Sequence, residues 1–147
     1  MVSANQLEEN YEEGILAVDC YNLTASGNDI DNHRGSGMVL VNTTSSAMAG
    51  NFVEQSTGWG LILRDSHANT FSAGFIRGTS SGEGIRMINS SFNTISGCCF
   101  EANDSLAMLI DKDSRQNNIT ANTISIERLV TRIPYSHGWM CGTKKPA

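Results

Sequence analysis

The sequence predicts an all-β fold, a right-handed parallel β-helix (a solenoid) of successive coils of about 23 residues each. Three observations predict it: a repeat with nearly constant spacing, apolar positions two residues apart inside each repeat, and no proline within the repeats. The repeats begin at Gly14, Gly37, Gly60, Gly84 and Ala107, which gives five coils, or six with the partial one before Gly14.

The residues that follow each repeat start form the first predicted strand. One apolar column contains Ile15, Met38, Leu61, Ile85 and Met108, and a second contains Ala17, Leu40, Leu63, Met87 and Ile110. The two columns lie two residues apart, which is the period of a β-strand with one face buried. Both are therefore expected to point into the core.

The second half of each repeat follows its own pattern. A column of small, mostly polar residues contains Ser26, Ala49, Ser72, Ser96 and Thr120. The next position holds only glycine or alanine: Gly27, Gly50, Ala73, Gly97 and Ala121. Three residues later an apolar column contains Ile30, Val53, Ile76, Phe100 and Ile124. The fifth copy needs a one-residue insertion near Asp113. Asn69, Asn93 and Asn117 recur just before this half, and stacked asparagines can hydrogen-bond from coil to coil.

Other repeat folds fit the pattern less well. The two prolines, Pro134 and Pro146, lie outside the repeats, and proline cannot donate to a β-ladder. Helical repeats would place apolar residues at i, i+3 and i+4, and leucine-rich repeats would fix leucines around the asparagine. Short strands separated by Gly, Asn and Ser corners remain.

The pattern also predicts how the chain is organised. Residues 1–133 are expected to form the coils, with 1–13 as a partial coil, because 2–7 overlays 25–30 at an offset of 23. Since no cap precedes this half-coil, we expect a segment of a longer β-helix. Residues 134–147 are expected to form a terminal cap or a subunit contact.

Composition excludes several classes of partner. A formal net charge of −5 argues against nucleic acid as the main partner, and no apolar run is long enough for membrane insertion. Cys20, Cys98, Cys99 and Cys141 form no CxxC pair, so no metal site and no cofactor are expected. Met38, Met48, Met87 and Met108 occupy positions expected to point inward, which favours core packing over copper binding.

The segment from Ser90 to Gly97, preceded by Gly84 and Ile85, resembles the pectate-lyase-like right-handed parallel β-helix superfamily. This group includes phage tailspikes, polysaccharide depolymerases and lyases, alginate epimerases, and periplasmic carbohydrate-binding or copper-maturation proteins. The resemblance covers residues 2–126 and implies the fold. It does not choose among these functions, and the sequence shows no catalytic motif of the group.

One outward-facing set of the first strand is unusually apolar. Leu16, Val18, Val39, Val41 and Ile62 alternate with the core columns and would form a stripe of about 400 Å², large for an exposed patch. A flanking segment of a longer chain could cover it. The alternative is an interface between chains, which in a tailspike-like protein would be that of a homotrimer.

A second outward column contains Asp31, Glu54, Arg77 and Glu101. Adjacent coils would separate these groups by ~4.8 Å and alternate coils by ~9.5 Å, distances that bracket glycosidase carboxylate pairs. Glu54 and Glu101 are therefore candidate catalytic residues, with Arg77 and Asp31 as candidate substrate-binding residues. The simpler explanation of the column is a solvated charge ladder, with Arg77 between acids, which contributes little energy.

Trp59, at the corner before Gly60, is a candidate stacking platform for a sugar ring or a corner filler. The sequence thus favours a segment of a phage tailspike or similar carbohydrate-directed fibre, located in the virion, with a polysaccharide or cell-surface glycan as partner. The alternatives are a secreted or periplasmic polysaccharide lyase, hydrolase or epimerase, and a non-catalytic scaffold or carbohydrate-binding module.

Overall fold

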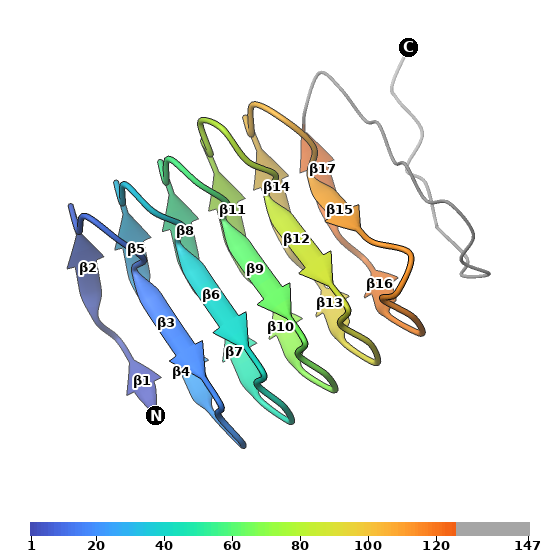
Figure 1. Cartoon of the computed structure of the whole chain (residues 1–147). Helices are drawn as coiled ribbons and strands as arrows, with labels where there is room; N and C mark the ends of the chain where they lie inside the picture. Colours follow the sequence, from blue (N-terminus) through green and yellow to red (C-terminus); the bar gives the residue numbers. More distant parts are fainter. Residues whose placement is uncertain (126–147) are drawn as a thin grey trace, which may run out of the picture.

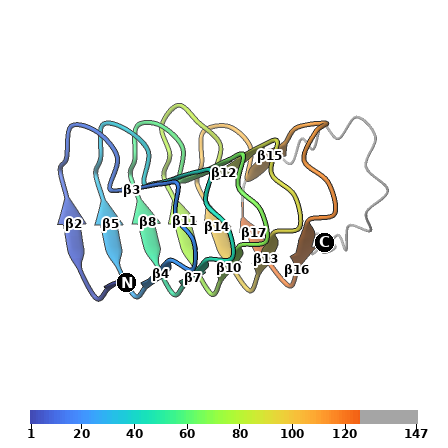
Figure 2. The same cartoon turned by 60° about the horizontal axis from the view of Figure 1, so that its bottom comes forward.

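A computed structural model describes residues 1–125, which form the predicted parallel β-helix. Each coil contributes one short strand to each of three parallel sheets (Figure 1). The coils follow one another along a single axis, as the turned view shows (Figure 2). The predicted tail, residues 134–147, lies outside the described residues.

Within residues 1–125, seventeen strands build the three sheets. Sheet A contains β1 (Val2–Ser3), β4 (Thr24–Ser26), β7 (Ala47–Ala49), β10 (Thr70–Ser72), β13 (Thr94–Ser96) and β16 (Asn118–Thr120). Sheet B contains β2 (Gln6–Glu8), β5 (Asp29–Asp31), β8 (Phe52–Glu54), β11 (Phe75–Arg77), β14 (Cys99–Glu101) and β17 (Thr123–Ser125). Sheet C contains β3 (Ile15–Val18), β6 (Met38–Val41), β9 (Leu61–Arg64), β12 (Ile85–Ile88) and β15 (Met108–Ile110).

The strand register confirms the repeat read from the sequence. In sheet C, Ile15 pairs with Met38, Met38 with Leu61, Leu61 with Ile85 and Ile85 with Met108. The inward columns of all three sheets meet in one apolar core, whose largest fully buried side chains include Phe71 and Phe100. Burial of these side chains is the main favourable contribution to folding.

Three of the methionines confirm the core-packing prediction, since Met38, Met48 and Met87 are at most 1% exposed. Cys20, Cys98 and Cys99 are free thiols, and Cys98 is buried. Among residues 1–125, no helix is long and apolar enough to cross a bilayer.

Asparagine ladders satisfy the backbone where the chain turns between sheets C and A. The side chain of Asn93 accepts hydrogen bonds from the backbone N–H of Asn69 at 2.9 Å and from its amide at 3.2 Å. It donates to the carbonyl of Ser66 at 3.0 Å and to Oδ1 of Asn117 at 3.2 Å. The predicted ladder is therefore present, and it runs beside a hydroxyl ladder in which Ser66 donates its backbone N–H to Oγ of Ser90.

A second, solvent-facing ladder lies at the end of sheet C. Asp19, Asn42, Asp65 and Asn89 occupy equivalent positions with φ between 46° and 53°, a region that Asn and Asp tolerate best among residues with a side chain. The amide of Asn42 donates to Asp19 and that of Asn89 donates to Asp65, both at 2.7 Å. Carboxylate and amide thus alternate from coil to coil.

The glycines that open the sheet C strands lie where the chain approaches itself closely. A Cβ at Gly37 would lie 2.1 Å from Cγ1 of Val53 and 2.8 Å from the carbonyl oxygen of Gly60. Gly14 and Gly60 are crowded in the same way by the neighbouring coil. The repeated glycine is therefore required by close packing at the corner between sheets B and C.

Candidate functional site: the outer face of sheet B

The outer face of sheet B brings four of the sequence-predicted site residues into one column. Asp31 pairs in register with Glu54, Glu54 with Arg77, and Arg77 with Glu101. Each side chain leaves the last residue of its strand, next to an inward residue of the core. Successive groups are therefore one coil apart, ~4.8 Å along the axis.

Arg77 and Glu54 form an ion pair at the centre of this column. Nη2 of Arg77 donates to Oε2 of Glu54 at 2.7 Å, and their side chains are 43% and 17% exposed. This hydrogen bond and the charge of Glu54 raise the pKa of the Arg77 guanidinium. The pair holds Glu54 in a fixed position and occupies one of its two carboxylate oxygens.

Asp31 lies in a more crowded position at the N-terminal side of the pair. Burial raises the pKa of the Asp31 carboxyl, and the nearby charges of Glu54, Asp29 and Glu8 raise it further. Within the described part of the chain, the buried Oδ1 of Asp31 has no hydrogen-bond partner. The ionised form of Asp31 is therefore disfavoured at this position.

Two phenylalanines that the sequence analysis did not single out lie beside this column. Phe52 and Phe75 are register partners on the same outer face. Their ring centroids are 5.2 Å apart with planes inclined by 33°, and Phe52 is 51% exposed. The guanidinium of Arg77 lies 5.5 Å from the centroid of the Phe75 ring, which joins the aromatic pair to the ion pair.

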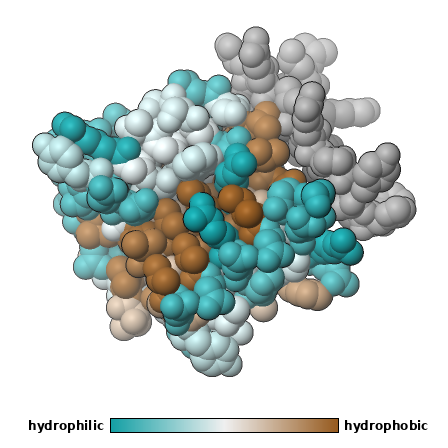
Figure 3. All heavy atoms as spheres, viewed as in Figure 1, coloured by the Kyte–Doolittle hydropathy of each residue, from teal (hydrophilic) through white to brown (hydrophobic). Residues whose placement is uncertain are grey.

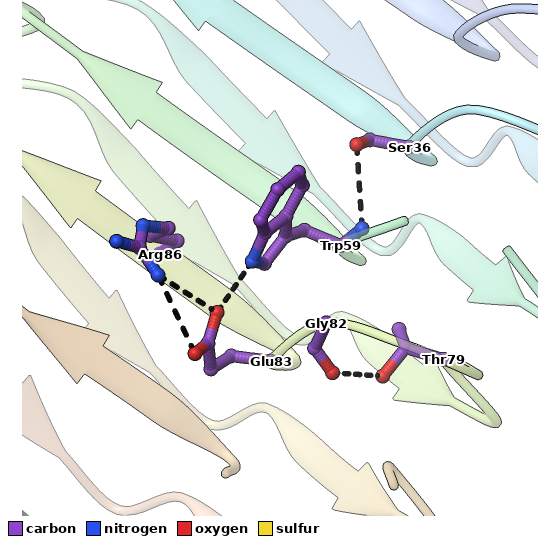
Figure 4. Close-up of polar contacts among 6 residues, drawn as sticks. All are labelled: Ser36, Trp59, Thr79, Gly82, Glu83 and Arg86. Atoms are coloured by element: carbon purple, nitrogen blue, oxygen red, sulfur yellow. Dashed lines mark hydrogen bonds and ion pairs between the residues drawn. The ribbon is translucent and has the colours of Figure 1, made fainter. Parts of the chain in front are cut away.

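Trp59 does not join the column. It lies at the corner between sheets B and C, where its indole N–H donates to Glu83 (Figure 4). Glu83 also binds Arg86 at 3.4 Å, and the Arg86 guanidinium lies 5.8 Å from the centroid of the indole ring. Arg86 projects from the outer face of sheet C. Trp59 is therefore held beside that face by its contacts with Glu83 and Arg86.

The residues of the predicted apolar stripe lie on the outer face of sheet C. Figure 3 shows hydrophobic side chains gathered at the lower left, over β3 and β6 of Figure 1. Leu16 and Val18 are 58% and 49% exposed, whereas Val39 and Ile62 are only 9% and 6% exposed in the single chain. The exposed part of the stripe is therefore concentrated at its N-terminal end.

Comparison with known proteins supports the fold. A family model described as "Periplasmic copper-binding protein (NosD)" matches residues 1–133. No curated protein matches the sequence significantly. Among solved structures, a double mutant of the periplasmic alginate epimerase AlgG superposes with a TM-score of 0.71 at 17% identity.

A glycosyl hydrolase candidate from Parabacteroides merdae superposes with a TM-score of 0.61 at 12% identity, covering 83% of this chain and 76% of that one. The superposition on AlgG covers 90% of this chain but only 40% of the epimerase. The chain thus spans less than half the length of the epimerase. At these identities the likeness is one of fold.

Proposed function

Because the chain belongs to the NosD family of parallel β-helix proteins, we propose that it is a glycan-binding β-helix whose binding surface is the outer face of sheet B. The observation that carries this proposal is the Phe52–Phe75 pair, exposed at Phe52 and half-buried at Phe75, beside the column of charged side chains. Aromatic rings give sugar rings an apolar face to pack on, and neighbouring polar groups bind the hydroxyls.

The spacing of the face suits a polymer that runs along the solenoid axis. Successive coils are ~4.8 Å apart, and the two phenyl rings are 5.2 Å apart. Both distances are close to the length of one pyranose residue in an extended glycan. Consecutive sugars would therefore meet equivalent positions on consecutive coils, with Phe52 and Phe75 under two of them.

The column supplies polar contacts for the same polymer. Glu54 is held in place by Arg77, and Glu101 lies on the coil that follows Arg77. Preorganised polar side chains lose less conformational entropy when a ligand binds. In the proposal Arg77 and Asp31 thus act as substrate-binding residues, while Trp59, engaged with Glu83, contributes only at the edge of the face.

Cleavage is a second candidate function, favoured by the separation of Glu54 and Glu101. Two coils place these carboxyls ~9.5 Å apart, within the range of inverting glycosidases. In that case Glu54→Gln and Glu101→Gln each abolish release of reducing ends from a bound polysaccharide, with the thermal midpoint nearly unchanged. Activity that survives both changes would leave the column with a binding role alone.

The family's description names copper, whose usual protein ligands are imidazole, thiolate and thioether. Within residues 1–125, no cluster of three or more His, Cys, Asp or Glu side chains is placed to hold a metal ion. Met38 and Met87 are buried on sheet C strands two coils apart, and Met48 is buried under sheet A. The described residues do not fit a copper centre, so no step of the proposed function involves copper.

The family's description also favours export to the periplasm over the virion location that the tailspike hypothesis requires. A tailspike would assemble as a homotrimer, and the exposed Leu16 and Val18 would then lie at the contact. The periplasmic proposal needs no such assembly. The oligomeric state therefore separates the two.

The glycan-binding proposal is tested by affinity electrophoresis against a panel of soluble neutral, acidic and cationic polysaccharides. Phe52→Ala and Phe75→Ala are each expected to weaken binding about tenfold, equivalent to about 1.4 kcal/mol. Phe92→Ala is the matched control, because Phe92 is 59% exposed at the corner between sheets C and A. If no polysaccharide is retarded, or if all three variants lose binding equally, the proposal fails.

A further inference from the structure

The outer face of sheet B is strongly acidic. Carboxylates project from it at Glu8, Asp29, Asp31, Glu54 and Glu101. Arg77 is the one cation among the described outward side chains of this sheet, and its charge is already compensated by Glu54. A ligand that approaches the aromatic pair therefore meets a field of negative sign.

The acidic side chains are concentrated at the N-terminal side of the aromatic pair. Glu8 pairs in register with Asp31, and Asp31 with Glu54, so that three carboxylates follow one another at one-coil spacing. Asp29 is the register partner of Phe52, which places a further carboxylate next to the exposed ring. No lysine or arginine stands among these four side chains on the outer face of β2, β5 and β8.

We propose that the glycan bound by this face is cationic, a polymer of amino sugars that carry free amino groups, with ammonium groups set against the carboxylates of Glu8 and Asp31. This inference rests on the proposed glycan-binding function and names its substrate class. A polymer with one ammonium group per sugar presents its charges at nearly the same spacing as the coils present theirs.

The local contacts favour this class over the others. The exposed carboxylate of Glu8 can accept a hydrogen bond from an ammonium group, which a polyuronate cannot donate from its carboxylates. A polyuronate would also place like charges beside Glu8, Asp29 and Asp31, which is unfavourable. The exposed ring of Phe52 adds attraction for a cation over its face.

The test is isothermal titration calorimetry with three oligosaccharides of equal length at low salt. These are a fully deacetylated glucosamine hexamer, the N-acetylglucosamine hexamer and a uronate hexamer. The deacetylated hexamer is expected to bind at least tenfold more tightly than the neutral hexamer, and the uronate hexamer is expected to bind most weakly. Added salt should reduce this preference, because it screens charge.

Variants separate specific contacts from general attraction to an acidic protein. Asp29→Asn/Asp31→Asn is expected to bring the affinity for the deacetylated hexamer to within threefold of that for the neutral one. Asp65→Asn/Asp113→Asn makes the same change in net charge at the corner between sheets C and A, the only corner that does not adjoin sheet B. This control double variant should retain the tenfold preference.

The outcomes distinguish the inference from the function on which it rests. Equal or tighter binding of the uronate hexamer, with Phe52→Ala still weakening it, overturns the charge preference and leaves glycan binding intact. An equal loss of preference in the two double variants also overturns it, since the attraction would then come from net charge. Binding of every hexamer that Phe52→Ala does not weaken contradicts the proposed function itself.

Discussion

The asparagine ladder between sheets C and A is expected to contribute several kcal/mol to stability, and Asn93→Ala tests this. The change removes the four hydrogen bonds of the Asn93 side chain to Asn69, Ser66 and Asn117. Each is worth about 1 kcal/mol net. Asn69 is only 2% exposed, so its backbone N–H loses its acceptor without gaining water. We therefore expect a loss of about 4 kcal/mol.

Urea denaturation followed by far-ultraviolet circular dichroism measures this loss. The midpoint should fall while the m-value stays constant, because both chains expose the same surface on unfolding. Asn118→Ala is the control, since Asn118 is exposed on the outer face of sheet A and its change should cost no more than about 0.5 kcal/mol.

Amide hydrogen exchange provides a second readout that is local. The backbone N–H of Asn69 should exchange much faster in Asn93→Ala, because its acceptor is the deleted side chain. A stability loss below about 1 kcal/mol, or equal losses in the two alanine variants, would show that the ladder does not stabilise the corner as argued.

Other changes give distinct signatures. Asp31→Asn should raise the free energy of unfolding at neutral pH by about 1 kcal/mol or less, because burial and nearby carboxylates raise the pKa of Asp31 and so disfavour its ionised form; an unchanged or lower thermal midpoint contradicts this. Burial lowers the pKa of His33, so stability should fall as pH falls below 6.5, where the unfolded chain binds the proton and the folded chain resists it; a midpoint equally pH-dependent in His33→Asn would refute this. Gly37→Ala should cost about 2–3 kcal/mol through its clash with Val53 and with the Gly60 carbonyl of the next coil, measured by urea denaturation. Lysines at Val39 and Val41 should dissociate any homotrimer in sedimentation equilibrium, and a monomeric parent chain would exclude that interface.

Sequence periodicity was sufficient to predict the fold because each coil repeats the same physical requirements. Only a small residue fits at Gly37, and only an apolar one fits inside at Leu61. The insertion near Asp113 was also predicted correctly, and there the chain forms an extra turn in which Ser114 donates its backbone N–H to the carbonyl of Asp111.

The site was only partly predictable. The charged column followed from register, since a period of two decides which side chains point outward. Phe52 and Phe75 obey the same rule, and reading the column that precedes Ile30 and Val53 would have found them. The partner of Trp59 was beyond this reasoning, because Glu83 lies in a corner whose shape does not follow from strand register.

The alternating ladder of Asp19, Asn42, Asp65 and Asn89 has a consequence for how the coils find their order during folding. Repeats that share the same apolar columns allow a strand to pair with the wrong coil, and such a slip keeps most apolar contacts. Pairing that skips one coil would set Asp19 against Asp65 and Asn42 against Asn89, exchanging amide–carboxylate bonds for repulsion between two carboxylates. The alternation of carboxylate and amide therefore favours pairing with the adjacent coil over pairing with the coil after it.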